Sequence, residues 1–115
     1  MDMLYYIYIG SNRVTIDHLS KITGGMFMAV SSCNKAAKVI DGIRERYNTS
    51  ILYEESTPQK DSQNITFLHK RFPRVYIILI TEGLQKEHRK LYLQAGVNNT
   101  LSPMASEESL QQMTK

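Results

Sequence analysis

The segment "VYIILIT", residues 75–81, constrains the fold most strongly. Its residues are almost all apolar or β-branched, a composition typical of a buried strand. A strand with one face in water alternates apolar and polar residues, whereas this segment does not alternate. We therefore expect both of its faces to be covered, as in the middle of a parallel sheet.

The rest of the chain alternates short apolar runs with segments of helical spacing. Strands are predicted at 4–9, 26–32, 50–54, 75–81 and 99–101, and helices at 14–23, 34–47, 63–72, 84–95 and 104–113. Residues 56–63, which contain Pro58, are predicted to form a loop. Five strands that alternate with five helices predict one α/β domain, a doubly wound, flavodoxin-like (βα)5 fold with a parallel five-stranded sheet.

Composition fits a single globular domain over residues 1–115. The net charge of +3 is too small to imply nucleic-acid binding. Cys33 is the only cysteine, which fits a reducing compartment such as the cytoplasm, and no apolar run is long enough to span a membrane. The last predicted helix stops without a glycine cap, so we expect the chain to be the N-terminal part of a longer protein.

Ligand sites in such sheets lie outside the carboxyl ends of the strands. No glycine-rich phosphate loop, no cluster of zinc ligands and no histidine beside Cys33 occurs at these ends, so we expect no enzyme activity, metal or cofactor. Glu54 and Glu55 are neighbours on one strand, and alternation makes a paired acid site unfavourable. The residues at the strand ends are Gly10, Ser11, Asn12, Cys33, Asn34, Glu54, Glu55, Thr81, Glu82, Ser102 and Pro103.

The order and spacing of these segments resemble the receiver (CheY-like) domain of bacterial two-component response regulators, over the whole chain. The motif "ILYEESTP" places Glu54 at the position of the phospho-accepting aspartate and Pro58 at the proline that follows it. "VYIILIT" places Thr81 at the hydroxyl position that responds to phosphate. "LYLQAGVNNTLSP" is similar to the family's segment from the fourth helix to the proline after the fifth strand.

Several departures from the family pattern concern the phosphorylation machinery. Gly10 and Ser11 stand where the resemblance places the acidic pair that binds magnesium. Ser102 stands at the lysine, and Glu54 replaces the acceptor aspartate. Without these charges an incoming phosphoryl group is not neutralised, so the resemblance implies a pseudo-receiver that is not phosphorylated. Glu54 then either hydrogen-bonds Thr81 as a permanent phosphate mimic or is a solvated remnant.

The main hypothesis is a regulatory or interaction module of a bacterial signalling protein that contacts protein partners or a second copy of itself. The alternatives are an atypical but active receiver, the N-terminal domain of a bacterial sugar transferase or other enzyme, and a small-ligand site lined by Asn12, Asn34, Glu54 and Thr81. Direct nucleic-acid binding and membrane insertion are not expected. The resemblance places an interaction face on the fourth and fifth helices and the fifth strand, at Tyr92, Asn98, Asn99, Met104 and Leu110.

Overall fold

The computed structural model describes residues 3–113. The strands are β1 (Met3–Ile9), β2 (Phe27–Val30), β3 (Tyr47–Glu54), β4 (Tyr76–Ile80) and β5 (Asn99–Leu101). The helices are α1 (Arg13–Ile22), α2 (Cys33–Ile43), α3 (Pro58–Arg71), α4 (Lys86–Ala95) and α5 (Glu107–Met113). The strands form one parallel sheet in the order β2-β1-β3-β4-β5, which confirms the doubly wound (βα)5 prediction.

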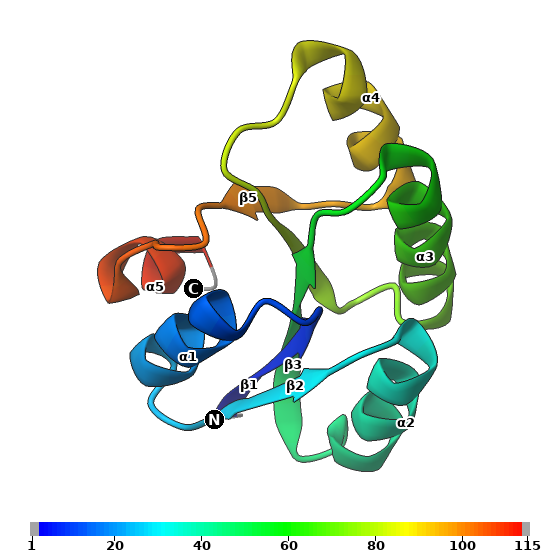
Figure 1. Cartoon of the computed structure of the whole chain (residues 1–115). Coiled ribbons are helices and arrows are strands. Elements are labelled where there is room, and N and C mark those ends of the chain that lie inside the picture. The colour runs from blue at the N-terminus through cyan, green and yellow to red at the C-terminus, as the bar shows by residue number, and fades with distance from the viewer. Residues whose placement is uncertain (1–2, 114–115) are drawn as a thin grey trace.

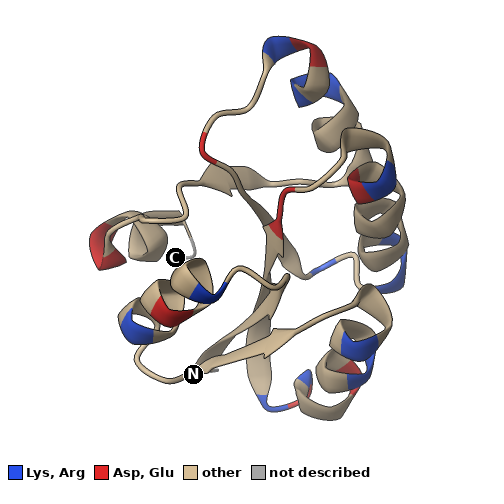
Figure 2. Ribbon diagram, viewed as in Figure 1, with Lys and Arg blue, Asp and Glu red and all other residues tan. Residues whose placement is uncertain are grey.

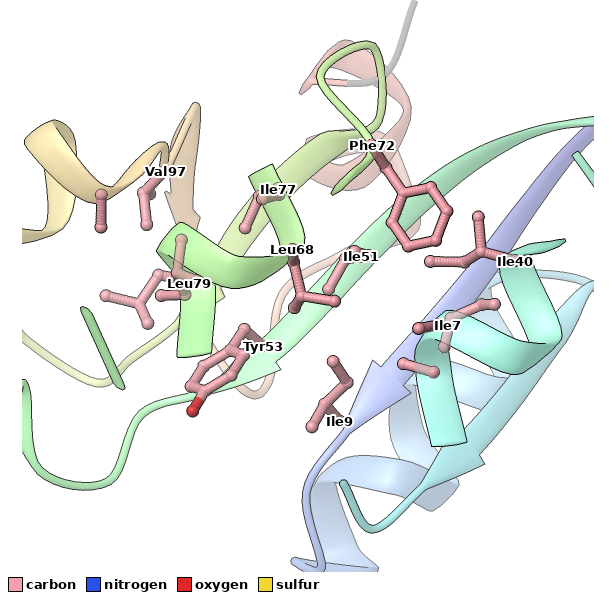
Figure 3. Packing of buried hydrophobic residues seen from close by; sticks show 14 of the residues in the cluster. Ile7, Ile9, Ile40, Ile51, Tyr53, Leu68, Phe72, Ile77, Leu79 and Val97 are labelled. Atoms are coloured by element: carbon pink, nitrogen blue, oxygen red, sulfur yellow. The ribbon is translucent and has the colours of Figure 1, made fainter. Parts of the chain in front are cut away.

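Two apolar layers cover the sheet, with α1 and α5 on one face and α2, α3 and α4 on the other (Figure 1). Residues of β3 alternate between the layers: Ile51 and Tyr53 pack toward α3, and Leu52 packs toward α1 and α5. Figure 3 shows the layer beneath α2 and α3, where Ile40, Leu68 and Phe72 meet the sheet. Ile77, Ile78 and Leu79 of β4 are fully buried, so both faces of this strand are covered as its composition predicts.

The largest difference from the prediction lies at residues 56–63, which do not form a long loop. Helix α3 begins at Pro58, in the first turn, where proline's missing N–H needs no partner. Strand β3 begins at Tyr47 rather than residue 50, because Tyr47, Asn48 and Thr49 pair with β1. Helix α2 begins at Cys33 rather than residue 34, and its cap is Ser32, whose hydroxyl accepts the hydrogen bond of Lys35 N.

The predicted interaction face needs two corrections. Tyr92 is fully buried between α4 and the sheet, and Leu110 is 1% exposed in the layer beneath α5. Tyr92 and Ala95 are the buried residues of α4, so Tyr92 belongs to the core rather than to an interaction face. Asn98, Asn99 and Met104 are exposed, as an interaction face requires.

Candidate functional site

The carboxyl ends of β1, β3, β4 and β5 meet at one edge of the sheet, and the sequence-predicted residues follow these strand ends. A pocket of about 440 Å³ is lined there by Asn12, Glu54, Thr81 and Pro103, among others. A second pocket of about 420 Å³ lies beside it and contains Asn34 and Cys33. The small-ligand hypothesis needed Asn12, Asn34, Glu54 and Thr81 in one pocket, whereas the structure divides them between two, with Glu54 lining both.

Glu54 turns toward the β1–α1 loop. Its Oε1 accepts hydrogen bonds from the Tyr8 hydroxyl at 2.5 Å and from Asn12 N at 2.9 Å, and its Oε2 accepts one from Ser11 N at 3.3 Å. A Cβ atom on Gly10 would lie 2.6 Å from Glu54 Cβ, so only glycine lets the loop close over this side chain. The carboxylate of Glu54 therefore occupies the space beside the loop and satisfies two of its backbone donors.

Thr81 bonds to Glu55 rather than to Glu54. The Thr81 hydroxyl donates to Glu55 Oε1 at 2.7 Å and accepts from Gly83 N at 3.2 Å. Glu55 reaches this position because its own N–H bonds to the carbonyl of Ile80 at 3.1 Å, which holds the chain against β4. Of the two expectations for Glu54, the contact with Thr81 is wrong, because the half-buried carboxylate bonds to Tyr8, Ser11 and Asn12 instead. The expectation that Glu54 is a remnant of a phospho-acceptor stays a prediction.

The predicted site residue Ser102 lies at the end of β5 and is exposed. Its hydroxyl accepts a hydrogen bond from Met104 N at 3.2 Å, which shapes the turn into the last helix. Within residues 3–113, no lysine or arginine forms an ion pair with Glu54 or Glu55. In the same part of the chain, no three His, Cys, Asp or Glu side chains come together as metal ligands. Figure 2 shows the acidic positions at the end of β3 and after β4.

Asp61 is a buried carboxylate that the sequence reasoning missed. It is 1% exposed and accepts hydrogen bonds from Tyr92 Oη at 2.8 Å, Tyr53 Oη at 3.2 Å and Ser56 N at 2.7 Å. It lies in the first turn of α3, where a negative charge is favourable. An available signal was the acidic residue three positions after Pro58, a pattern typical of a helix start.

Burial raises the pKa of three tyrosine hydroxyls well above the ordinary value of 10.0. For Tyr8 the bond to Glu54 raises the pKa further, and for Tyr92 the bond to Asp61 does the same. Burial, followed by the charge of Asp61, also raises the pKa of the Cys33 thiol to about 11. A thiol with this pKa is mostly protonated near neutral pH and is a weak nucleophile.

Alkaline pH is expected to destabilise the fold because of these groups. Above pH 10 an unfolded tyrosine loses its proton while Tyr8, Tyr53 and Tyr92 keep theirs, so the unfolded state binds fewer protons and stability falls as pH rises. Each such group contributes a slope of about 1.4 kcal/mol per pH unit. Urea unfolding followed by circular dichroism at several pH values should show this decline. The slope should be shallower in Y53F/Y92F, and a wild-type free energy of unfolding that stays constant through pH 11 would contradict the assignment.

Comparison with known proteins gives matches at the level of structure. No family model matches the chain, and no curated protein matches its sequence. The crystal structure of a CheY-like protein (tadZ) from Pseudomonas aeruginosa superposes with a TM-score of 0.76 at 13% identity, over 98% of this chain and 91% of that one. The chain has the receiver-domain fold.

Two further receiver-like structures are informative. A pilus assembly-related protein from Burkholderia pseudomallei matches with a TM-score of 0.72 at 16% identity, over 96% of this chain and 89% of that one. An atypical orphan response regulator, described with a phosphorylation-independent regulatory mechanism, matches with a TM-score of 0.70 at 13% identity, over 94% of this chain and 88% of that one. The same fold therefore occurs both in a pilus assembly-related protein and in a response regulator described with a phosphorylation-independent mechanism.

Proposed function

We propose that this chain is a pseudo-receiver, a regulatory module that contacts other proteins and is not switched by phosphorylation of Glu54. The observation that carries the proposal is the position of the Glu54 carboxylate, which accepts three hydrogen bonds from Tyr8, Ser11 and Asn12. An acceptor carboxylate must instead face an incoming phosphoryl group with an oxygen free to attack it. Transfer to Glu54 would require these bonds to break first.

The charges around the site support the same proposal. A transferred phosphoryl group is stabilised by cations, usually a metal ion and a lysine or arginine. Gly10 and Ser11 bring no carboxylate to bind a metal, and Ser102 brings no positive charge. Glu55 and Glu82 line the same pocket as Glu54, so a phosphoryl group there would meet negative charge on several sides.

Protein partners are the proposed output of the module. Of the predicted interaction face, Asn98 and Asn99 are exposed at the start of β5 and Met104 is exposed after its end, and Leu93 of α4 is 58% exposed. We propose that this face contacts a second copy, a partner or a further domain of a longer bacterial protein in the cytoplasm. None of the helices within residues 3–113 has the length and apolar character that crossing a membrane requires. Pilus assembly is the first process in which to seek a partner, because one structure of the same fold comes from a pilus assembly-related protein.

The proposal predicts that phosphate analogues do not change the domain. In the presence of Mg²⁺ and beryllofluoride, the backbone amide NMR signals of Glu54 and Thr81 should stay in place. Acetyl phosphate should add no phosphoryl group detectable by intact mass. A phosphorylatable receiver domain under the same conditions serves as the positive control. A saturable shift at Thr81 would establish the alternative, an atypical but active receiver, and would overturn the pseudo-receiver.

A further inference from the structure

A third pocket lies at the opposite edge of the sheet from Glu54. Its volume is about 660 Å³, against about 440 Å³ and 420 Å³ for the two pockets at the carboxyl ends of the strands. It is formed by the ends of α2 and α3 and by the beginnings of β3 and β4. Its size falls in the range of sites that hold small organic ligands.

Three arginines give the pocket a positive charge. Arg44, Arg71 and Arg74 line it, and all three are exposed. Asp41 contacts Arg71 at 2.5 Å and Arg44 at 3.8 Å, so the four side chains together carry a formal charge of +2. Arg74 forms no ion pair with any residue in 3–113. In Figure 2, Lys and Arg positions mark α2, α3 and the loop between α3 and β4.

An unpaired hydroxyl lies in the wall of the same pocket. Thr49 lines the pocket, is 8% exposed, and its Oγ1 has no hydrogen-bond partner among the described residues. A buried hydroxyl without a partner is uncommon in folded proteins. Half-buried Tyr47 adds aromatic surface beside it, and Tyr76 lines the pocket from the other face of the sheet, where it packs with Leu4 and Met113. The pocket therefore combines positive charge, an apolar wall and, covered by that wall, a hydroxyl without a partner.

We propose that this pocket binds a small organic phosphate. Each guanidinium group is planar and can donate to two phosphate oxygens at once. A phosphomonoester dianion matches the formal charge of +2, and its organic part would pack against Tyr47. The opposite edge of the sheet, with Glu54, Glu55 and Glu82, has the wrong charge for the same ligand. The site thus gives the module a possible phosphate-dependent input that does not involve Glu54.

The proposal can be tested by NMR titration of the ¹⁵N-labelled chain with AMP, adenosine and inorganic phosphate at constant ionic strength. AMP is expected to shift the amide signals of Thr49 and Arg74 saturably, inorganic phosphate to bind at the same signals more weakly, and adenosine to have little effect. R74A should weaken AMP binding about tenfold, because it removes a charge-assisted hydrogen bond. D41N should tighten binding, since it removes the carboxylate that competes for Arg71 and Arg44.

The matched control is R89A on α4, an exposed arginine that does not line the pocket and should leave AMP binding unchanged. Arg74, Asp41 and Arg89 are all exposed, so these variants should fold normally. The proposal is overturned if AMP at roughly 10 mM shifts no signal at the pocket, a concentration at which even weak specific sites are occupied. It is also overturned if R74A and R89A weaken AMP binding to the same extent, because that result indicates general charge attraction. It is overturned as well if a glutamate-rich peptide binds more tightly than AMP, because that result indicates a protein partner.

Discussion

Replacing Asp61 with alanine is expected to lower the free energy of unfolding by about 3–5 kcal/mol. The carboxylate is 1% exposed and receives the hydroxyls of Tyr53 and Tyr92 and the N–H of Ser56. Its loss leaves the Tyr53 and Tyr92 hydroxyls and the Ser56 N–H without this acceptor, and an unsatisfied buried donor costs about 1–3 kcal/mol. Because a domain of this size is stable by only about 5–15 kcal/mol, the variant should be close to unfolding.

Urea unfolding followed by circular dichroism measures the effect of D61A, and Asp41 provides the matched control. Asp41 is also an aspartate that pairs with neighbouring side chains, but 37% of its side chain is exposed, so D41A should cost less than about 1 kcal/mol. In a Y53F/Y92F background two of the three donors are absent, and D61A should then cost clearly less. The hydrogen bonds of Asp61 would not be what stabilises the fold if D61A and D41A lowered the free energy of unfolding equally. The same conclusion would follow if the effect of D61A were unchanged in the Y53F/Y92F background.

The sheet could be predicted from the sequence because its main strands are continuous apolar runs. Residues 4–9 and 75–81 correspond to β1 and β4 with small changes at the ends, since burial on both faces leaves little freedom of pattern. The start of α3 could not be found in the same way. Pro58 is unfavourable inside a helix but favourable in its first turn, and the sequence alone did not distinguish the two cases.

The candidate site was predictable in position but not in contacts. Glu54, Thr81 and Gly10 do lie at one edge of the sheet, because the carboxyl ends of parallel strands meet there. Which glutamate reaches Thr81 depends on how the chain leaves β3, and the bond from Glu55 N to Ile80 O decides it. The sequence pattern predicts Tyr8 only as a buried strand residue, although its hydroxyl makes the shortest hydrogen bond to Glu54, at 2.5 Å. Sequence spacing carries no information on these side-chain directions.

Replacing Gly10 with alanine is expected to destabilise the fold by about 2–3 kcal/mol, the range for an added methyl group in a tightly packed position. The new Cβ would lie 2.6 Å from both Cβ and Cδ of Glu54. Glu54 Cβ is attached directly to β3, which pairs with β1 through Ile9 and Tyr53, so it cannot move aside. The loop must shift instead, and the bonds from Ser11 N and Asn12 N to Glu54 should lengthen or break.

Gly42 of α2 is the matched control, because no atom lies within 4 Å of a Cβ placed there. In a helix alanine is favoured over glycine, so G42A should raise the free energy of unfolding by up to about 1 kcal/mol, opposite in sign to G10A. Urea unfolding gives both values, and amide NMR shifts at Ser11 and Asn12 report the loop. A neutral G10A with unchanged loop signals would show that Glu54 does not pack beneath the loop. The same clash means that the Glu54 side chain and a carboxylate at position 10 cannot occupy the site together. G10D alone should therefore not create a magnesium site. The glycine at position 10 and the direction of the Glu54 side chain depend on each other.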